Sequence, residues 1–292
     1  GNDVELLGYG NVLDTSGAYD TARAVNVASV LRGGALVSGR SAASDSNVDS
    51  LVTAFIGDNA NVNAGNDAVV NARSYTQVDT DSFTRLIGLI GFQCLASATN
   101  SIEVSTLSGS PDLTSPSGFV LTAGDDIEVV SDTDLRSRAD SDAVLIGLGW
   151  AQANSENEIS DVNTVALLGN GTSTNAGDTV LVHAEKLVGT SVTANTGLLG
   201  SANTSDSITA NTAAIVTGTA TSIGGTSITV SVVDPIVSRV KSTVTDRDSS
   251  AEDWAQAVKE GGIGAQAGVA ADVVLLSGID DGHGQGQGPA GL

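Results

Sequence analysis

The stretch ANVNAGNDAVVNARS, residues 60–74, decides the fold because its pattern returns twice further along the chain. The second copy is LTAGDDIEVVSD at 121–132 and the third is TSTNAGDTVLVHAE at 172–185. Their Ala-Gly pairs begin at residues 64, 123 and 176, so the copies are 59 and 53 residues apart. Each copy joins a glycine turn to a run of alternating aliphatic residues, which indicates a repeated structural unit.

A second phrase repeats with the same step. RLIGLIGFQCLASATNSIEV at 85–104 corresponds to VLIGLGWAQANSENEI at 144–159, and ALVSGRSAASDSNV at 35–48 is a weaker first copy. Phe92 and Trp150 fall at nearly corresponding places in this phrase, which predicts aromatic side chains stacked in the core. Two phrases that recur in one order favour successive copies packed on one another.

The repeated segments have the pattern of short strands. In DIEVVSD, TVLVHAE and SITVSVV the aliphatic residues alternate, as they do in a strand with one buried face. Gly-Asp, Gly-Asn and Asn-Gly pairs lie between the strands and favour tight turns, and residues 65–67 are expected to form one. We therefore predict an all-β fold, a β-solenoid (β-helix) of stacked strand-turn repeats, with a body at 1–234 whose clearest repeats span 35–190.

The C-terminal part has a different pattern. The segment SSAEDWAQAVKEGG predicts one short helix at about 250–260, because Ser250 suits an N-cap, Trp254, Ala257 and Val258 share one helical face, and Gly261 follows. The tail IDDGHGQGQGPAGL has no apolar period and is expected to be flexible. Residues 235–292 are therefore predicted to be a cap or connector.

The composition excludes several classes of partner. The chain has 34 acidic and 12 basic residues and a formal charge of −22, so nucleic acid is not an expected partner. No apolar run reaches the roughly 18 residues needed to cross a bilayer, so membrane insertion is not expected. Cys94 is the only cysteine and is expected to be a buried small hydrophobe. The acidic, lysine-poor composition favours an extracellular location.

The passages IGDNANVNAGNDAVVNA and LIGLGWAQANSENEISDVNTVALLGNGTSTNAGDTVLVHAE resemble the passenger repeats of large bacterial surface adhesins, the filamentous haemagglutinin-like and leukotoxin-like secreted proteins. The resemblance covers roughly residues 35–190. It implies a long fibrous body of stacked coils, and the family offers no catalytic residues to carry over. The chain departs from a regular array in its unequal spacings and in the insert around SGSPDLTSPSG.

Paired aspartates are the main chemical hint. Each pair is two residues apart, which on a strand places both carboxylates on one face. Such oxygens can bind Ca²⁺, can hydrolyse glycosidic bonds, or can form a solvated face that prevents aggregation. The candidates are Asp79, Asp81, Asp132, Asp134, Asp140 and Asp142.

Other chemistry has little support in the sequence. His183 and His283 are 100 residues apart and no Gly-x-Ser-x-Gly elbow occurs, so no catalytic residue is assigned and His183 is expected to face outward from a strand. No nucleotide-binding motif is present, and no cofactor is expected apart from a possible Ca²⁺. Asn170 and Asn203 begin N-glycosylation sequons.

The sequence therefore predicts a non-enzymatic structural protein of the cell surface, part of a fibre, sheath or adhesin. Stacked repeats leave open strand edges at their ends, so the expected partner is another copy of the chain, with surface glycans a further possibility. The alternative is a carbohydrate-active enzyme or carbohydrate-binding module on a β-helix that uses the aspartate pairs.

Overall fold

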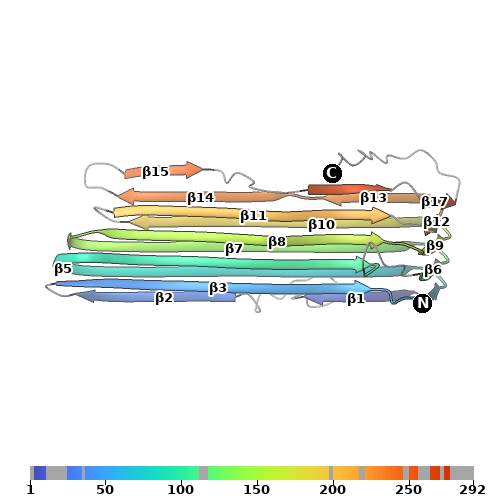
Figure 1. The fold of residues 1–292 in the computed structure, drawn as a ribbon, viewed down its shortest axis with the longest axis horizontal. Helices are drawn as coiled ribbons and strands as arrows, with labels where there is room; N and C mark the ends of the chain where they lie inside the picture. Colours follow the sequence, from blue (N-terminus) through green and yellow to red (C-terminus); the bar gives the residue numbers. More distant parts are fainter. Residues whose placement is uncertain are drawn as a thin grey trace.

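The computed structural model is an all-β protein with parallel sheets and a β-helix-like arrangement (Figure 1). It describes residues 3–10, 25–34, 37–111, 118–196, 200–216, 221–245, 250–255, 264–269 and 273–276. Within these ranges every regular element is a strand, and no helix is long and apolar enough to span a membrane.

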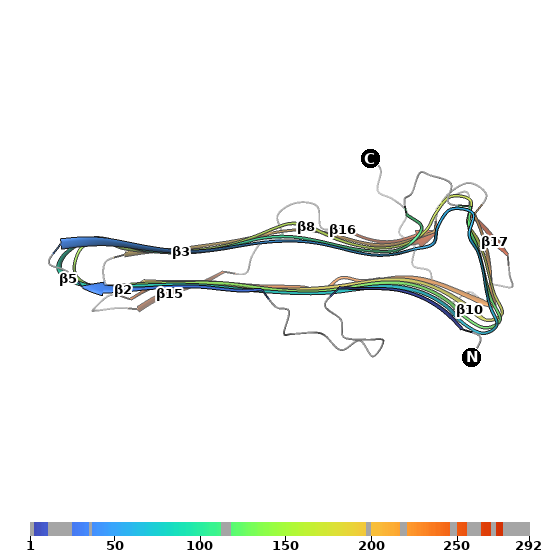
Figure 2. The same ribbon diagram turned by 90° about the horizontal axis from the view of Figure 1, so that it is seen from below.

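The long strands form two layers that face each other, and β5 bends from one layer into the other (Figure 2). Layer one contains β1 (Val4–Gly10), β2 (Val25–Gly34), the first part of β5 (Ala68–Gly109), β7 (Ile127–Leu148), β10 (Thr179–Thr196), β13 (Ser227–Val233), β14 (Ile236–Thr245) and β15 (Ser250–Ala255). Layer two contains β3 (Val37–Phe55), the rest of β5, β8 (Ala151–Leu168), β11 (Gly200–Val216) and β16 (Gly264–Val269).

A short sheet closes the wide end of the two layers (Figure 2). Its strands are β4 (Asn61–Ala64), β6 (Val120–Ala123), β9 (Ser173–Ala176), β12 (Thr221–Gly224) and β17 (Val273–Leu276). One passage of the chain through the short sheet, layer one and layer two is called a rung below. β4 and β5 form the second rung, β6 to β8 the third, and β9 to β11 the fourth.

The rungs stack in parallel register, as the repeats predict, and each rung is shorter than the one before it. Along layer one, Val4 aligns with Ala68, then Ile127, Val180 and Ile228. The steps between these partners are 64, 59, 53 and 48 residues. Connecting segments account for part of these differences, since 14 residues lie between Gly10 and Val25 but only three between their partners Ser74 and Val78. At the end where the layers join, the third rung is longer than the fourth, with seven residues between Ala143 and Ala151 and three between Thr196 and Gly200.

The repeated Ala-Gly-acid phrase is a stacked corner between the short sheet and layer one. A Cβ atom placed on Gly124 would lie 2.0 Å from the carbonyl oxygen of Gly65, and one on Gly177 would lie 1.9 Å from that of Gly124. Glycine recurs here because the backbones of successive rungs approach too closely for any side chain.

The acidic residue of the phrase joins one rung to the next. The Asp67 carboxylate accepts a hydrogen bond from the Asp126 backbone N–H at 3.2 Å, and the Asp126 carboxylate accepts one from the Thr179 N–H at 3.0 Å. These donors lie at the turn, where the strand ladder is interrupted, so the carboxylates satisfy groups that would otherwise lack a partner. The phrase recurs because each copy forms a hydrogen bond with the backbone of the next copy.

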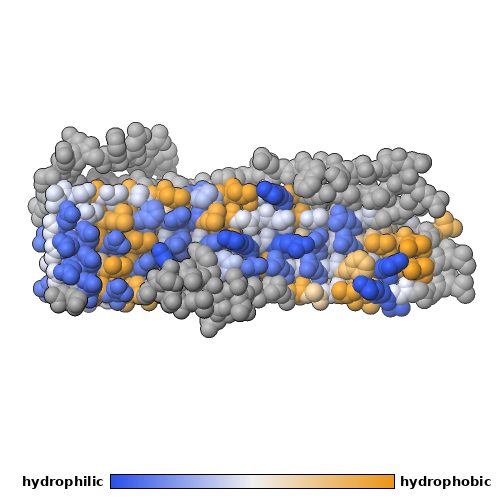
Figure 3. Space-filling model, turned by 180° about the vertical axis from the view of Figure 1, so that it is seen from behind, coloured by the Kyte–Doolittle hydropathy of each residue, from blue (hydrophilic) through white to orange (hydrophobic). Residues whose placement is uncertain are grey.

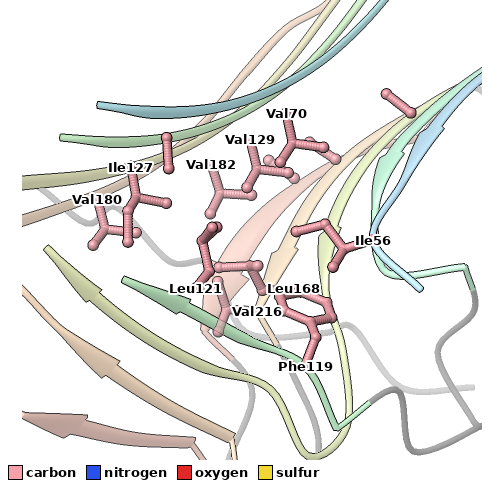
Figure 4. Close-up of a cluster of buried hydrophobic side chains, with 14 of the residues drawn as sticks. Ile56, Val70, Phe119, Leu121, Ile127, Val129, Leu168, Val180, Val182 and Val216 are labelled. Atoms are coloured by element: carbon pink, nitrogen blue, oxygen red, sulfur yellow. The ribbon is translucent and has the colours of Figure 1, made fainter. Parts of the chain in front are cut away.

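The largest apolar cluster lies inside the wide end, between the short sheet and both layers (Figure 4). Val70, Val129 and Val182 stack there as register partners of one column. Phe119 is the largest fully buried side chain in the described residues. Alternating aliphatic residues thus supply the core, as their period predicts.

The layers approach each other more closely away from the wide end (Figure 2). The interior there combines two smaller apolar clusters, around Leu135 and around Leu86, with buried small and hydroxylated side chains. Ser155 Oγ donates to the Thr193 carbonyl oxygen in the opposite layer at 2.5 Å, and Ser82 Oγ donates to the Ala42 carbonyl oxygen at 3.0 Å. Cys94 is fully buried in this region, as expected. Hydroxyl-to-backbone bonds therefore connect the two layers in addition to these apolar contacts.

The predicted C-terminal helix is wrong for its described part. Residues 250–255 form β15, which pairs antiparallel with β14, and residues 256–260 lie outside the described ranges, as does the tail. The free edge of β14 offers backbone hydrogen bonds that an isolated short helix must compete with. At the proposed boundary, β13 and β14 flank Asp234 and Pro235 and both pair with β10.

Candidate functional site

The six candidate aspartates all lie on the outer side of layer one, but they do not gather into one site. Each occupies an outward position of β5 or β7, as the two-residue spacing predicts. Within the described part of the chain, no group of three or more His, Cys, Asp and Glu side chains could hold a metal ion. The function of each aspartate must therefore be inferred from the groups that its carboxylate contacts.

Asp134 is held by an arginine from its own strand. Arg136 contacts both carboxylate oxygens, with Nε 3.2 Å from Oδ1 and Nη2 3.0 Å from Oδ2. The same guanidinium lies over the Tyr75 ring, 5.7 Å from its centroid. This bidentate geometry fixes both side chains and leaves Asp134 only 4% exposed.

Arg138 lies among the next acids. Its Nη2 atom is 2.6 Å from Asp140 Oδ2 and 4.0 Å from Asp81 Oδ1. The hydrogen bond with Asp140 raises the pKa of Arg138 above its ordinary value. The guanidinium thus occupies the position between neighbouring carboxylates on β5 and β7 that a bound cation would need.

The remaining candidates also have partners. Gln77 Nε2 donates to Asp79 Oδ2 at 2.9 Å, and Asn195 Nδ2 donates to Asp142 Oδ1 at 2.7 Å. Arg73 Nε lies 3.6 Å from Asp132 Oδ2. Burial raises the pKa of Asp132, and Arg73 opposes that rise. The carboxylates are therefore engaged one by one along the face.

The outer side of layer two has a different charge pattern. It carries Asp45, Asp49, Glu103, Glu156, Glu158 and Asp161, all exposed. Residues 41–55, 93–109, 151–168 and 200–216 contain no Lys, Arg or His. Asp49, Glu103 and Asp161 are register partners, so like charges stand side by side on adjacent strands. This face repels any anionic surface.

The two glycosylation candidates lie in different settings. Asn170 follows β8 in the turn that leads to β9 and is partly exposed. Asn203 is exposed on the outer side of layer two, and its Nδ2 donates to Asn154 Oδ1 at 2.9 Å. His183 also faces outward, as expected, and its Nδ1 lies 2.8 Å from Ser231 Oγ.

The N-terminal side of the stack is an open edge. In the described ranges, β1 and β3 pair only with β5 and carry no strand on their other side. Val4 and Leu6 align with the core residues Ala68 and Val70, yet each is 38% exposed. This edge offers unpaired backbone groups together with uncovered apolar side chains.

Two features were not predicted from the sequence. Lys186 is fully buried, and its Nζ lies 3.0 Å from Asp234 Oδ1. It follows Val182 and Ala184 at the same strand parity, which is the signal that could have revealed it. Trp150, expected in the core, is 47% exposed, and the side chain of Phe92 lies outside the described set.

Comparison with protein-family models, with curated proteins and with solved structures finds no match for this chain.

Proposed function

We propose that the chain is a non-enzymatic structural protein, a β-solenoid segment that forms part of an extracellular fibre, sheath or adhesin at a cell surface. The N-terminal edge of the described strands carries this proposal, because Val4 and Leu6 align with core residues of β5 and are each 38% exposed. The edge accepts a further rung from a second copy of the chain, which would pair with β1 and β3 and cover both side chains.

The internal construction supports a shaft. The stacked corners join successive rungs through Gly65, Gly124 and the Asp126 carboxylate. A force that pulls along the stack would therefore pass from one rung to the next through these contacts. The acidic, lysine-poor surface suits an extracellular setting. A shaft of this kind functions by spanning a distance and by joining other subunits at its ends, and it needs no concave ligand site.

The carbohydrate-active alternative needs two carboxylates that are free to handle a proton or a water molecule at a glycosidic bond. Asp134 and Asp140 instead contact arginine groups, and Asp79 accepts from Gln77. The contacts of the paired aspartates therefore favour the structural function.

Sedimentation velocity and electron microscopy over a range of concentrations test the proposal. We expect the wild-type chain to form linear assemblies and Leu6→Lys to shorten them, because a lysine on the open core column prevents a second copy from docking. Leu51→Lys is the matched control, since Leu51 lies on the same edge but faces outward and is 67% exposed. A wild-type chain that forms no linear assemblies at high concentration contradicts axial self-association.

A further inference from the structure

The third rung projects beyond the fourth at the end where the two layers join. The last residue of β7 that pairs with β10 is Ala143, opposite Thr196, whereas β7 continues to Leu148. On its other side this extension remains paired with β5, from Val144 opposite Arg85 to Leu148 opposite Ile90. Residues 144–150 are called the ledge below.

The ledge has a free backbone edge. Among the described strands, none pairs with residues 144–148 on the side that faces away from β5. Strands that end a sheet in this way present unpaired N–H and C=O groups and accept a further strand readily. The cause is the shorter connection in the fourth rung, because three residues lie between Thr196 and Gly200, whereas seven lie between their partners Ala143 and Ala151.

The side chains of the ledge are apolar and exposed. Ile146 is 48% exposed, Leu148 69% and Trp150 47%, and the segment VLIGLGW contains no charged residue. Ile87, the register partner of Ile146, is 47% exposed beside it. Figure 3 shows apolar surface gathered close to this end of layer one. Exposed apolar groups in one patch next to a free strand edge favour association.

The outer side of layer two does not favour association between copies. The outer side of layer two carries exposed carboxylates without a cation in residues 41–55, 93–109, 151–168 or 200–216, and the chain has a formal charge of −22. Two copies that approach through this face therefore repel each other. The ledge is uncharged, so the repulsion is smallest where the apolar surface and the free backbone edge coincide.

We propose that the ledge is an interface between two copies of this chain, in which the two segments 144–148 pair antiparallel about a two-fold axis near Ile146. A two-fold axis requires identical residues to exchange contacts and makes the paired strands antiparallel. Ile146 then lies beside its symmetry mate and Val144 beside Leu148, and the pairing stops there because β10 occupies the same edge of β7 up to Ala143. No like charges are opposed, and layer one continues from one molecule into the other.

This pairing goes beyond axial stacking, since it uses a different edge and closes after two copies instead of propagating. Each molecule contributes one ledge, so the product is a side-by-side dimer. Within a fibre, the same contact would join two shafts laterally. It does not depend on Val4 or Leu6, and each contact can therefore fail without the other.

Light scattering on size-fractionated protein provides the first test, under conditions where Leu6→Lys suppresses axial assembly. We expect that variant to have twice the 29.0 kDa mass of one chain, and Leu6→Lys/Ile146→Lys to have the mass of a single chain at the same concentration. Leu6→Lys/Leu51→Lys is the matched control and should remain dimeric, since Leu51 is also an exposed aliphatic residue, 67% against 48% for Ile146, but lies on a different strand, β3. Ile146 is half-exposed, so circular dichroism should show an unchanged fold.

Cross-linking provides a second test that reports geometry. Ile146→Cys should form a disulfide with its symmetry mate under mild oxidation, whereas Leu51→Cys should not. The native Cys94 is buried and should not react in either variant. A Leu6→Lys chain that is monomeric throughout, or a dimer that survives Ile146→Lys, would overturn the proposal. Linear assemblies that persist in Ile146→Lys would show that axial stacking holds independently.

Discussion

The side-chain amide of Asn100 donates to the side-chain oxygen of Asn157 at 2.8 Å, although 57 positions separate the two residues. Both are fully buried between the layers. The Asn100 amide also donates to the Arg138 carbonyl oxygen at 2.9 Å, and its own oxygen accepts from Ser46 and Thr80. One asparagine thus joins neighbouring rungs and opposite layers.

Asn100→Ala should therefore lower the free energy of unfolding by about 3 kcal/mol, because it leaves several buried donors and acceptors without a partner. Asn163→Ala is the control, since Asn163 faces outward and donates to the exposed Asp161. It should change stability by about 0.5 kcal/mol or less. Urea denaturation of both variants provides the measurement, and equal losses would contradict the role assigned to Asn100.

Gly124→Ala should disrupt the stacked corner, because the new Cβ would lie 2.0 Å from the Gly65 carbonyl oxygen. The rungs must separate to admit it, and we expect a loss of about 3 kcal/mol or a failure to fold. Gly57→Ala is the matched control, since a Cβ there meets no atom within 4 Å. Thermal unfolding of the two variants should differ clearly, and a stable Gly124→Ala would refute the close-approach argument.

Lys186→Met should destabilise the fold by about 3 to 5 kcal/mol, because it removes the cation beside the nearly buried Asp234 carboxylate. The double variant Lys186→Met/Asp234→Asn should recover much of that loss, since neither charge then remains in the interior. A double-mutant cycle by chemical denaturation measures the coupling between the two side chains. If the losses of stability in the two single variants add up to the loss in the double variant, the interaction between Lys186 and Asp234 contributes nothing to stability.

Asp206 should make stability depend on pH. Burial raises the pKa of this carboxyl, which accepts hydrogen bonds from Ser238 and Thr190. Because the folded pKa lies above the unfolded one, protonation favours the folded state. Its contribution should be complete below the unfolded pKa and should be lost as the pH rises through the folded pKa.

Asp206→Asn should thus raise stability at neutral pH by about 1 kcal/mol, because it removes a charge that is costly to bury. The gain of the variant over the wild type should disappear as the pH falls through the raised pKa of Asp206. Thermal unfolding at several pH values compares the two proteins. A variant that is less stable than wild type at neutral pH would contradict the sign.

Chelation should leave the wild-type melting temperature unchanged, because Arg138 already provides the cation between Asp81 and Asp140. In Arg138→Ala the carboxylates face each other without it, so millimolar Ca²⁺ should stabilise that variant more than NaCl of equal ionic strength does. Differential scanning fluorimetry with EDTA, Ca²⁺ and NaCl provides the comparison. A wild-type chain that loses stability in EDTA would indicate a cation site elsewhere.

The sequence predicted the features that depend on repetition. Recurring Ala-Gly-acid phrases revealed the stacked corners, and alternating aliphatics revealed the strands and the burial of Cys94. It did not reveal features that depend on how far each rung extends. Trp150 was expected in the core because it repeats the position of Phe92, but the fourth rung ends before it reaches the ledge.

The helix predicted for the C-terminal segment was wrong for a related reason. The local pattern around Ser250 and Trp254 suits a helix, but it contains no information about the edge of β14 that residues 250–255 join. The aspartate pairs were placed correctly on one face. Their arginine partners were not predicted, because the contact between Arg138 and Asp81 crosses between strands that only the register brings together.

The unequal rung lengths make each level of the stack distinguishable from the others. Identical repeats can skip a neighbour or exchange with an equivalent segment of another chain while they fold. Here the steps of 64, 59, 53 and 48 residues differ, so a segment paired one level out of place would have connections that are too long or too short for its neighbours. We therefore expect the unequal connections to favour one order of stacking as this repetitive sequence folds.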